Sequence, residues 1–279
     1  MDRKIGVIDS GVGGLTVARE IMRQLPQESM MYFGDTARCP YGPRPAQEVR
    51  TFTLQMIAYL TQHHMKALVI ACNTATAVVL GEISQVAPIP VIGVIDPGAR
   101  TAIKETKNGI VGVIGTEGTI LSGAYEKALK RINPDVEVYS LACPKLAPFV
   151  ESGITDEEEA HRMVSESLQD FEQIPIDTLI LGCTHYPLLS KYISGVMGER
   201  VKLINSAEET ARELSVVLDY KGLLASKHSP VCQPQHKFFV SGRSAVMERI
   251  AQTFLNAPLD LKQVDLAKEK DCPLNWTKS

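Results

Sequence analysis

A pattern that occurs twice constrains this chain more than any other feature. Residues 66–79 are KALVIACNTATAVV and residues 177–189 are DTLILGCTHYPLL. In each, an apolar run typical of a strand buried on both faces ends at a cysteine, Cys72 or Cys183, and a stretch able to begin a helix follows. Open α/β sheets bind ligands at the carboxyl edge of their strands. We therefore expect a thiol at this edge in each half of the chain.

A second repeat supports an internal duplication. The segments IGVIDSGVGGLTV, from residue 5, and VGVIGTEGTIL, from residue 111, are offset by 106 residues, close to the 111 that separate the cysteines. Each is a predicted strand followed by a glycine-containing turn with a hydroxyl, Ser10 or Thr116. Strands and helices alternate along the whole sequence, which predicts an α/β fold of parallel sheets covered by helices on both faces.

The boundaries of the predicted elements follow from apolar spacing and turn signals. The segment Asp96-Pro97-Gly98 is a strong turn signal, and we expect the chain to cross between its two halves there. Besides the two cysteine strands, we expect strands at residues 5–8, 30–33, 89–95, 111–114, 136–140, 201–204 and 237–240, and helices at 15–24, 47–63, 125–131, 155–171, 207–220 and 245–255.

The first glycine-rich turn, DSGVGG from Asp9, only partly matches a dinucleotide-binding fingerprint. A carboxylate aimed at a phosphate would repel it, so the turn suits a substrate that carries an ammonium group. The later loop with three prolines offers the Tyr41 hydroxyl and the bare backbone N–H of Gly42 for binding. Cys39 lies in the same loop with no basic neighbour in sequence, and we interpret it as incidental.

Composition excludes several classes of protein. The 44% hydrophobic and 22% charged content is ordinary for a globular protein, and a net charge of −3 gives no attraction to nucleic acid or to acidic membranes. No apolar run approaches the roughly 20 residues that span a bilayer. The first strand starts within four residues of Met1, so we expect no signal peptide and a cytoplasmic protein with reduced cysteines. Without CxxC or HxxxH spacing, we expect no metal site.

Two thiols facing each other across a cleft suit inversion at a carbon atom, because one can remove a proton while the other returns one from the opposite side. Each predicted helix N-terminus lowers the cost of a thiolate at its cysteine. His185 could exchange protons with one thiol and Asp9 with the other, and Glu151 could support His185. Three functions remain open: a two-thiol racemase, a hydrolase using one Cys–His pair, and a non-catalytic amino-acid-binding protein.

Eight short motifs, in order between about residues 5 and 206, resemble the glutamate racemases of the aspartate/glutamate racemase superfamily. They are Asp9-Ser-Gly-Val-Gly-Gly-Leu, Gly34-Asp-Thr-Ala-Arg, Pro40-Tyr-Gly, Ala71-Cys-Asn-Thr-Ala-Thr-Ala, Gly115-Thr-Glu-Gly-Thr, Ala142-Cys-Pro, Val150-Glu-Ser-Gly and Gly182-Cys-Thr-His-Tyr-Pro-Leu-Leu. The sequence departs at Pro43-Arg44-Pro45, where a Lys-Ser pair is usual. We interpret this departure as loop variation.

The resemblance implies two α/β domains with a substrate cleft between them, residues 1–97 plus the returning 208–279 forming one and 98–207 the other. It implies cofactor-independent interconversion of L- and D-glutamate for peptidoglycan synthesis, by a cytoplasmic enzyme that is commonly a homodimer. The matching catalytic positions are Cys72, Cys183, Asp9, His185 and Glu151. The matching substrate-contacting positions are Asp9, Ser10, Tyr41, Gly42, Asn73, Thr74, Thr116, Thr184 and His185. Aspartate racemase is the nearest alternative.

Overall fold

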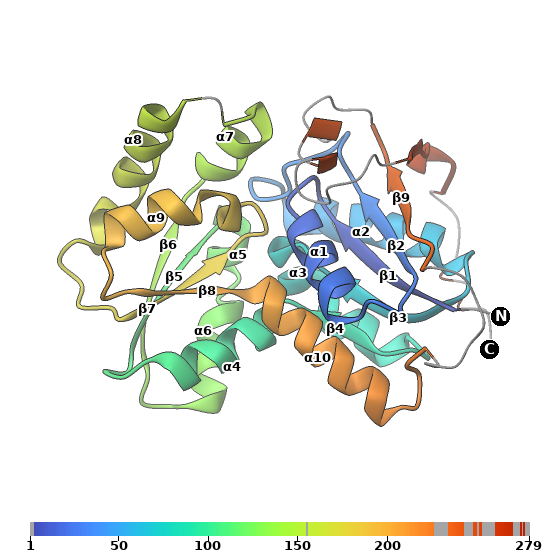
Figure 1. Ribbon diagram of the computed structural model, residues 1–279, viewed down its shortest axis with the longest axis horizontal. Helices are drawn as coiled ribbons and strands as arrows, with labels where there is room; N and C mark the ends of the chain where they lie inside the picture. Colours follow the sequence, from blue (N-terminus) through green and yellow to red (C-terminus); the bar gives the residue numbers. More distant parts are fainter. Residues whose placement is uncertain are drawn as a thin grey trace.

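The computed structural model describes residues 3–154, 156–225, 234–242, 248–249, 251–252, 260–269, 274 and 276. These residues form two lobes, each built on a parallel sheet (Figure 1). The first lobe contains six strands in the order β10-β9-β2-β1-β3-β4, and the second contains four in the order β6-β5-β7-β8. The strands are β1 Lys4–Asp9, β2 Met30–Gly34, β3 Met65–Ile70, β4 Val91–Gly93, β5 Ile110–Gly115, β6 Glu137–Ala142, β7 Thr178–Gly182, β8 Lys202–Asn205, β9 Lys237–Val240 and β10 Leu261–Gln263.

The strand order confirms the predicted duplication. The series β2-β1-β3-β4 in the first sheet reappears as β6-β5-β7-β8 in the second, so all four strands of the second sheet have a counterpart in the first, which adds β9 and β10. In both sheets the strand before a glycine-rich turn, β1 or β5, pairs in parallel with a cysteine strand, β3 or β7. The turn and the thiol therefore come from neighbouring strand ends in each lobe.

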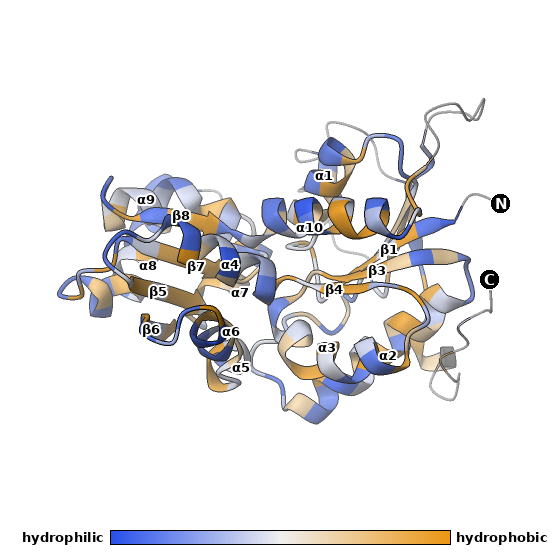
Figure 2. Ribbon diagram, turned by 90° about the horizontal axis from the view of Figure 1, so that it is seen from below, coloured by the Kyte–Doolittle hydropathy of each residue, from blue (hydrophilic) through white to orange (hydrophobic). Residues whose placement is uncertain are grey.

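Helices cover both faces of each sheet, as the alternation of elements predicts. Apolar residues buried at helical spacing attach α1 and α10 to one face of the first sheet and α2 and α3 to the other. Figure 2 shows these two helix layers on opposite sides of the strands. The α-helices are α1 Leu15–Gln24, α2 Ala46–Thr61, α3 Asn73–Val86, α4 Ile95–Glu105, α5 Glu117–Leu121, α6 Ala124–Ile132, α7 Leu146–Ser152, α8 Glu157–Leu168, α9 Ser190–Met197 and α10 Ser206–Tyr220.

The two lobes exchange one helix each. Helix α4 follows β4 of the first lobe, yet its Ile95, Ala99 and Ala102 are buried in the core of the second lobe against α6 and β7. Helix α10 follows β8 of the second lobe, yet its apolar stripe packs against α1 and the first sheet. The chain thus crosses between lobes at two junctions, β4–α4 and β8–α10, and Arg100 of α4 forms an ion pair with Glu213 of α10 beside them.

Two expectations about local structure are wrong, and one lies outside the described residues. Asp96-Pro97-Gly98 is not a turn but part of the first turn of α4, where proline is tolerated because the N–H it lacks would have no intrahelical partner. The expected strand 89–95 is shortened to Val91–Gly93 because that helix begins at Ile95. The expected helix at 245–255 falls mostly outside the described residues. The domain boundaries at 97 and 208 stay a prediction.

Among the residues that the structure describes, no helix combines the length and the apolar character needed to cross a membrane.

Candidate active site

The two cysteines of the repeated pattern occupy the carboxyl ends of β3 and β7. Cys72 is the N-cap of α3, and Cys183 directly follows β7. Each is only 6% exposed. Cys72 belongs to the first lobe and Cys183 to the second, and a charge on Cys183 is one of the smaller influences that raise the pKa of Cys72, so the two thiols lie within electrostatic range. The structure places each of these two cysteines directly after its strand, where the repeated pattern predicted a thiol.

Cys72 is held as a neutral thiol. Burial, followed by the negative charge of Asp9, raises its pKa to about 12. The backbone N–H of Ala75, in the first turn of α3, and the hydroxyl of Ser10 act in the opposite direction by stabilising the thiolate. Ser10 is thus placed beside the first thiol, as expected for a residue of the site. A proton on Cys72 is available for donation at neutral pH.

Cys183 is coupled to an acid–base pair. Its Sγ lies 3.5 Å from Nδ1 of His185, and Nε2 of the same ring lies 2.6 Å from Oε1 of Glu151. Burial by itself would lower the pKa of His185, but the interactions with Cys183, Cys39 and Glu151 outweigh burial and raise it well above the usual value. Burial would likewise raise the pKa of Glu151, but the bond from His185 and its charge lower it. His185 and Glu151 therefore form an imidazolium–carboxylate pair next to the Cys183 thiol.

Asp9 ends β1 and is completely buried. Its Oδ2 accepts a 2.9 Å hydrogen bond from the backbone N–H of Gly11, and its Oδ1 accepts a 3.2 Å hydrogen bond from the hydroxyl of Thr184 in the second lobe. Burial raises the pKa of Asp9, and the charge of His185 partly opposes this. The carboxylate therefore touches both lobes while its charge acts on Cys72.

The glycine-rich turn after β1 packs directly against the second lobe. A Cβ atom built on Gly13 would lie 2.4 Å from Oγ1 of Thr184 and 2.8 Å from Nδ1 of His185. Any side chain here would push the two lobes apart, since real Cβ atoms do not approach other atoms so closely. Gly13 thus allows a close approach between the lobes.

A group of hydroxyl and amide side chains lies beside Cys72. The hydroxyls of Thr74, Thr116 and Thr119 are 2.9 to 3.2 Å from one another and join α3 to the turn after β5. Asn73 accepts a 2.7 Å hydrogen bond from Tyr125 through Oδ1, whereas its buried Nδ2 has no partner among the described residues. Buried amide N–H groups rarely lack an acceptor, so this atom is a candidate donor to a ligand.

The proline-rich loop is held by hydrogen bonds within the protein, and substrate contact by Tyr41 and Gly42 stays a prediction. The Tyr41 side chain is only 1% exposed, and its hydroxyl donates a 2.5 Å hydrogen bond to Oδ2 of Asp35. Gly42 contacts the second lobe: its carbonyl accepts a 3.0 Å hydrogen bond from the N–H of Gly118, and a Cβ on Gly42 would lie 2.6 Å from Cβ of Thr116. The hydrogen bond of Tyr41 to Asp35 therefore stabilises the loop. The backbone of Gly42 attaches the loop to the segment after β5.

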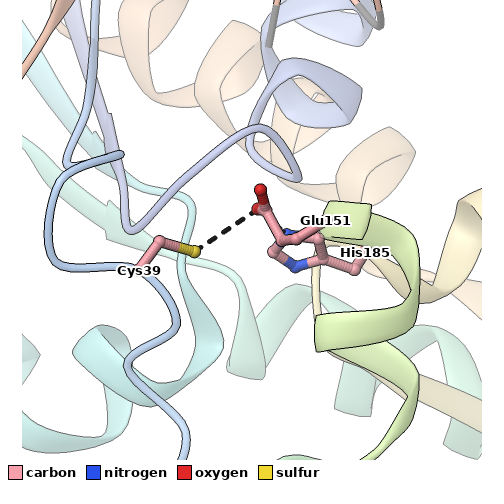
Figure 3. Close-up of side chains that lie close together, drawn as sticks. All are labelled: Cys39, Glu151 and His185. Atoms are coloured by element: carbon pink, nitrogen blue, oxygen red, sulfur yellow. Dashed lines mark hydrogen bonds and ion pairs between the residues drawn. The ribbon is translucent and has the colours of Figure 1, made fainter. Parts of the chain in front are cut away.

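Cys39, interpreted from the sequence as incidental, lies beside two residues of the site. Its Sγ lies 3.3 Å from Oε1 of Glu151, next to the Glu151–His185 pair (Figure 3). Sequence reasoning missed this contact because the three residues are far apart in the chain. The pairing of β2 with β1 places Gly34 level with Asp9, so the loop that carries Cys39 starts at the same edge as the active site. Tyr125 was also missed because none of the quoted motifs contains it, and Thr119 was missed as a site residue although it ends the motif Gly115-Thr-Glu-Gly-Thr.

Comparisons with known proteins agree with this arrangement. The model of the family described as Asp/Glu/Hydantoin racemase matches residues 5–214, a range that contains both cysteine strands and ends within α10. The chain belongs to this racemase family.

Within the racemase family, several glutamate racemases are similar to this chain over nearly its whole length. One from Bacillus cereus is 53% identical over 270 residues, covering 96% of this chain and 99% of the relative. The crystal structure of a glutamate racemase isoform from Bacillus anthracis superposes with a TM-score of 0.91 at 52% identity, over 95% of this chain and 98% of that one. A Francisella tularensis glutamate racemase, solved in complex with D-glutamate, gives a TM-score of 0.87 at 34% identity over 96% and 99%.

Proposed function

We propose that this protein is a glutamate racemase that interconverts L- and D-glutamate by a two-thiol mechanism without a cofactor. The observation that carries the mechanism is the pair Cys72 and Cys183, which end equivalent strands of two duplicated lobes and lie within electrostatic range of each other. Glutamate is supported as the substrate because relatives at 53% and 52% identity are glutamate racemases.

The proposed reaction inverts the α-carbon in two proton transfers. A thiolate on one side removes the α-proton and becomes a thiol, and the electron pair left on carbon is delocalised into the substrate carboxylate. The thiol on the other side donates its proton to the opposite face and becomes a thiolate. The carbon keeps all its substituents with inverted configuration, and the two cysteines end with their protonation states exchanged.

The neighbouring groups return the thiols to their starting states. His185 is placed to pass a proton between Nδ1 and Cys183, because Glu151 on Nε2 stabilises the charged imidazole. Asp9 is placed to act on Cys72, whose pKa it raises. We assign catalytic roles to both cysteines and positioning roles to Asp9, Glu151 and His185.

Substrate contacts follow from the polar groups at the cleft. The unpartnered Nδ2 of Asn73 would donate to the α-carboxylate, close to the N-terminus of α3, which favours negative charge. Ser10, Thr74, Thr116 and Thr184 supply hydroxyls, and Asp9 supplies a negative charge that suits the ammonium group. Gly42 lines a small pocket together with Thr116 and with prolines from both lobes.

We also propose that the enzyme is a cytoplasmic homodimer whose D-glutamate enters peptidoglycan synthesis. Support for an association surface comes from Val216 and Tyr220, which are 63% and 90% exposed and share one face of α10 because they are four residues apart. Light scattering on the purified chain measures the oligomeric state directly, and a monomer at micromolar concentration would overturn this part.

Solvent exchange at the α-carbon tests the reaction. L- and D-glutamate are incubated separately with the enzyme in heavy water without added cofactor, and deuterium at the α-position is followed by NMR together with optical rotation. We expect exchange with loss of optical rotation for both enantiomers. Cys72→Ser and Cys183→Ser should each abolish racemisation, and the exchange that each variant retains identifies the thiol serving each enantiomer.

The alternatives give different results in the same assay. An aspartate racemase would exchange aspartate and leave glutamate unlabelled. A hydrolase would lose its activity through Cys183 alone, and a non-catalytic amino-acid-binding protein would show neither exchange nor dependence on either thiol. Absence of exchange with both amino acids would contradict the two-thiol mechanism.

A further inference from the structure

Cys39 has no task in the proposed reaction, yet its thiol is positioned next to catalytic support groups. The side chain is partly buried, and its Sγ points toward the carboxylate of Glu151 at 3.3 Å (Figure 3). The residue comes from the loop between β2 and α2 in the first lobe, whereas Glu151 belongs to α7 and His185 to the segment after β7 in the second. Three potential metal ligands of different chemical type therefore meet where the lobes touch.

The ligand atoms are close enough for one metal ion to reach all three. Sγ of Cys39, a carboxylate oxygen of Glu151 and a ring nitrogen of His185 all lie within 4.8 Å of one another. Atoms bound to one tetrahedral zinc ion at its usual bond lengths are roughly 3.5 Å apart. The observed 3.3 Å between Cys39 and Glu151 fits this separation, and the 2.6 Å between Glu151 and His185 must widen slightly.

The donor set selects among metals. A thiolate, an imidazole and one carboxylate oxygen match Zn²⁺ and its spectroscopic substitute Co²⁺, whereas Mg²⁺ and Ca²⁺ prefer sites made of oxygen atoms. We propose that Cys39, Glu151 and His185 form an inhibitory site for Zn²⁺, with three protein ligands and a water in the fourth position. Sequence spacing could not reveal this site, because Cys39 and Glu151 are 112 residues apart and Glu151 and His185 are 34 residues apart.

Binding at this site would interrupt the proposed chemistry in two ways. A metal on Nε2 of His185 leaves the ring proton on Nδ1, the nitrogen 3.5 Å from Cys183, so the ring can donate toward the thiol but can no longer accept its proton. The metal would also link Cys39 of the first lobe to Glu151 and His185 of the second, which opposes opening of the cleft. The inhibition rests on the proposed racemase function, but the metal site itself does not.

Metal binding is measured first, on the whole chain and without glutamate, because the amino acid is itself a ligand for divalent metals. Co²⁺ is titrated into the protein while the sulfur-to-cobalt charge-transfer absorption is followed, and Zn²⁺ is then added to displace it. Cys232 and Cys272, which lie outside the described residues, are replaced by serine in every sample so that they cannot contribute a thiolate.

In this background, Cys39→Ser is compared with Cys143→Ser, which removes a buried thiol that is not among the three grouped ligands. We expect Cys39→Ser to lose the absorption and to weaken binding by about 100-fold or more, since changing even a hydrogen-bond partner of a metal ligand weakens binding by 10–100-fold. Cys143→Ser should bind like its parent. Charge-transfer absorption that persists in Cys39→Ser, or a parent that binds neither metal, overturns the site.

Racemase assays then test inhibition. Zn²⁺ should inhibit the parent while the same concentration of Mg²⁺ does not, and Cys39→Ser should resist Zn²⁺ when each protein is compared with its own metal-free rate. Cobalt binding that depends on Cys39 without any inhibition by zinc would overturn the inhibitory role while supporting the site. A metal-free chain with no racemase activity would instead contradict the proposed function, and the cobalt titration would still decide the site.

Discussion

The Tyr125 hydroxyl donates a 2.7 Å hydrogen bond to Oδ1 of Asn73, which leaves Nδ2 of Asn73 buried without a partner among the described residues. Tyr125 belongs to α6 of the second lobe and Asn73 begins α3 of the first. The interaction therefore fixes the orientation of the amide at the contact between the lobes before any ligand binds. A donor that is already oriented can bind a carboxylate without further ordering cost.

Replacing Asn73 by alanine should impair substrate binding. A hydrogen bond to a charged group contributes about 1.5–3 kcal/mol, so Asn73→Ala should lower kcat/KM for glutamate by roughly 10–100-fold, mainly through KM. Steady-state racemisation kinetics in both directions measure this. Tyr125→Phe is the control, because it removes the hydroxyl that holds Asn73 and keeps the amide donor. Equal losses in both variants would indicate that Asn73 acts only through the structure.

Two neighbours of Cys72 should move its pKa in opposite directions. Burial, with help from the charge of Asp9, raises this pKa to about 12, whereas the Ser10 hydroxyl opposes the rise. Asp9→Asn should therefore lower the pKa of Cys72, and Ser10→Ala should raise it. The ultraviolet absorbance of thiolates, titrated against pH and corrected with Cys72→Ser, reports the ionisation. Shifts of the same sign in both variants would refute the assignment of these charges.

The same pKa has a consequence for stability at alkaline pH. The usual pKa of a cysteine is 9.0, and the folded protein holds the Cys72 proton up to about pH 12. The unfolded chain releases this proton first as pH rises, so the contribution of Cys72 is complete below about pH 9 and is lost toward pH 12. The free energy of unfolding should fall less steeply over this window in Cys72→Ala than in the parent, as measured by denaturant titration. An unchanged slope would contradict the prediction.

Gly13 should not tolerate a side chain. Its Cβ would meet Thr184 and His185 within 2.4 and 2.8 Å, so Gly13→Ala should displace the lobes and abolish most racemase activity while each lobe stays folded. Gly81→Ala is the matched control, because nothing lies within 4 Å of its Cβ and alanine favours the α3 helix by about 0.5–1 kcal/mol. Circular dichroism and activity are measured on both. Full activity in Gly13→Ala would show that the lobes are less tightly apposed.

The exchanged position of α10 predicts where a core mutation acts. Leu214 is fully buried against α1 and the first sheet, so Leu214→Ala should cost about 2–5 kcal/mol of stability. Hydrogen exchange should show lost protection in α1 and β1, although α10 follows the last strand of the second lobe. Val86→Ala, at a position 57% exposed, should have little effect. Loss of protection confined to β7 and β8 would mean that α10 stabilises the second lobe instead.

Local patterns were sufficient to predict much of this molecule. The apolar runs at β3 and β7, the duplication and the position of α1 at Leu15–Gln24 follow from periodicity and are found in the structure. The grouping of Cys183, His185 and Glu151 was also anticipated, and the structure places these side chains in contact. Strand-end thiols were predictable because a buried strand that stops at a polar residue has a distinctive pattern.

The remaining features depend on tertiary packing. Asp96-Pro97-Gly98 has the composition of a turn, but the burial of Ile95 and Ala99 in the second lobe makes it a helix start. Cys39 could be placed only once β2 was known to pair with β1. The Tyr41 hydroxyl looked available in sequence, and its hydrogen bond to Asp35 came from folding of the loop. In each case a partner distant in sequence or a folded loop decides the outcome.

The exchange of α4 and α10 gives the duplication a physical meaning. A chain that ended after one repeat would carry a helix unable to cover its own sheet, and one face of that sheet would be only partly covered, by α1 or by α6. Two copies of such a chain could complete each other by trading these helices, in the manner of a domain-swapped dimer. When the two copies are joined in one polypeptide, the swapped helices remain and the two lobes can no longer dissociate. Cys72 and Cys183 are then held in the same molecule at any protein concentration.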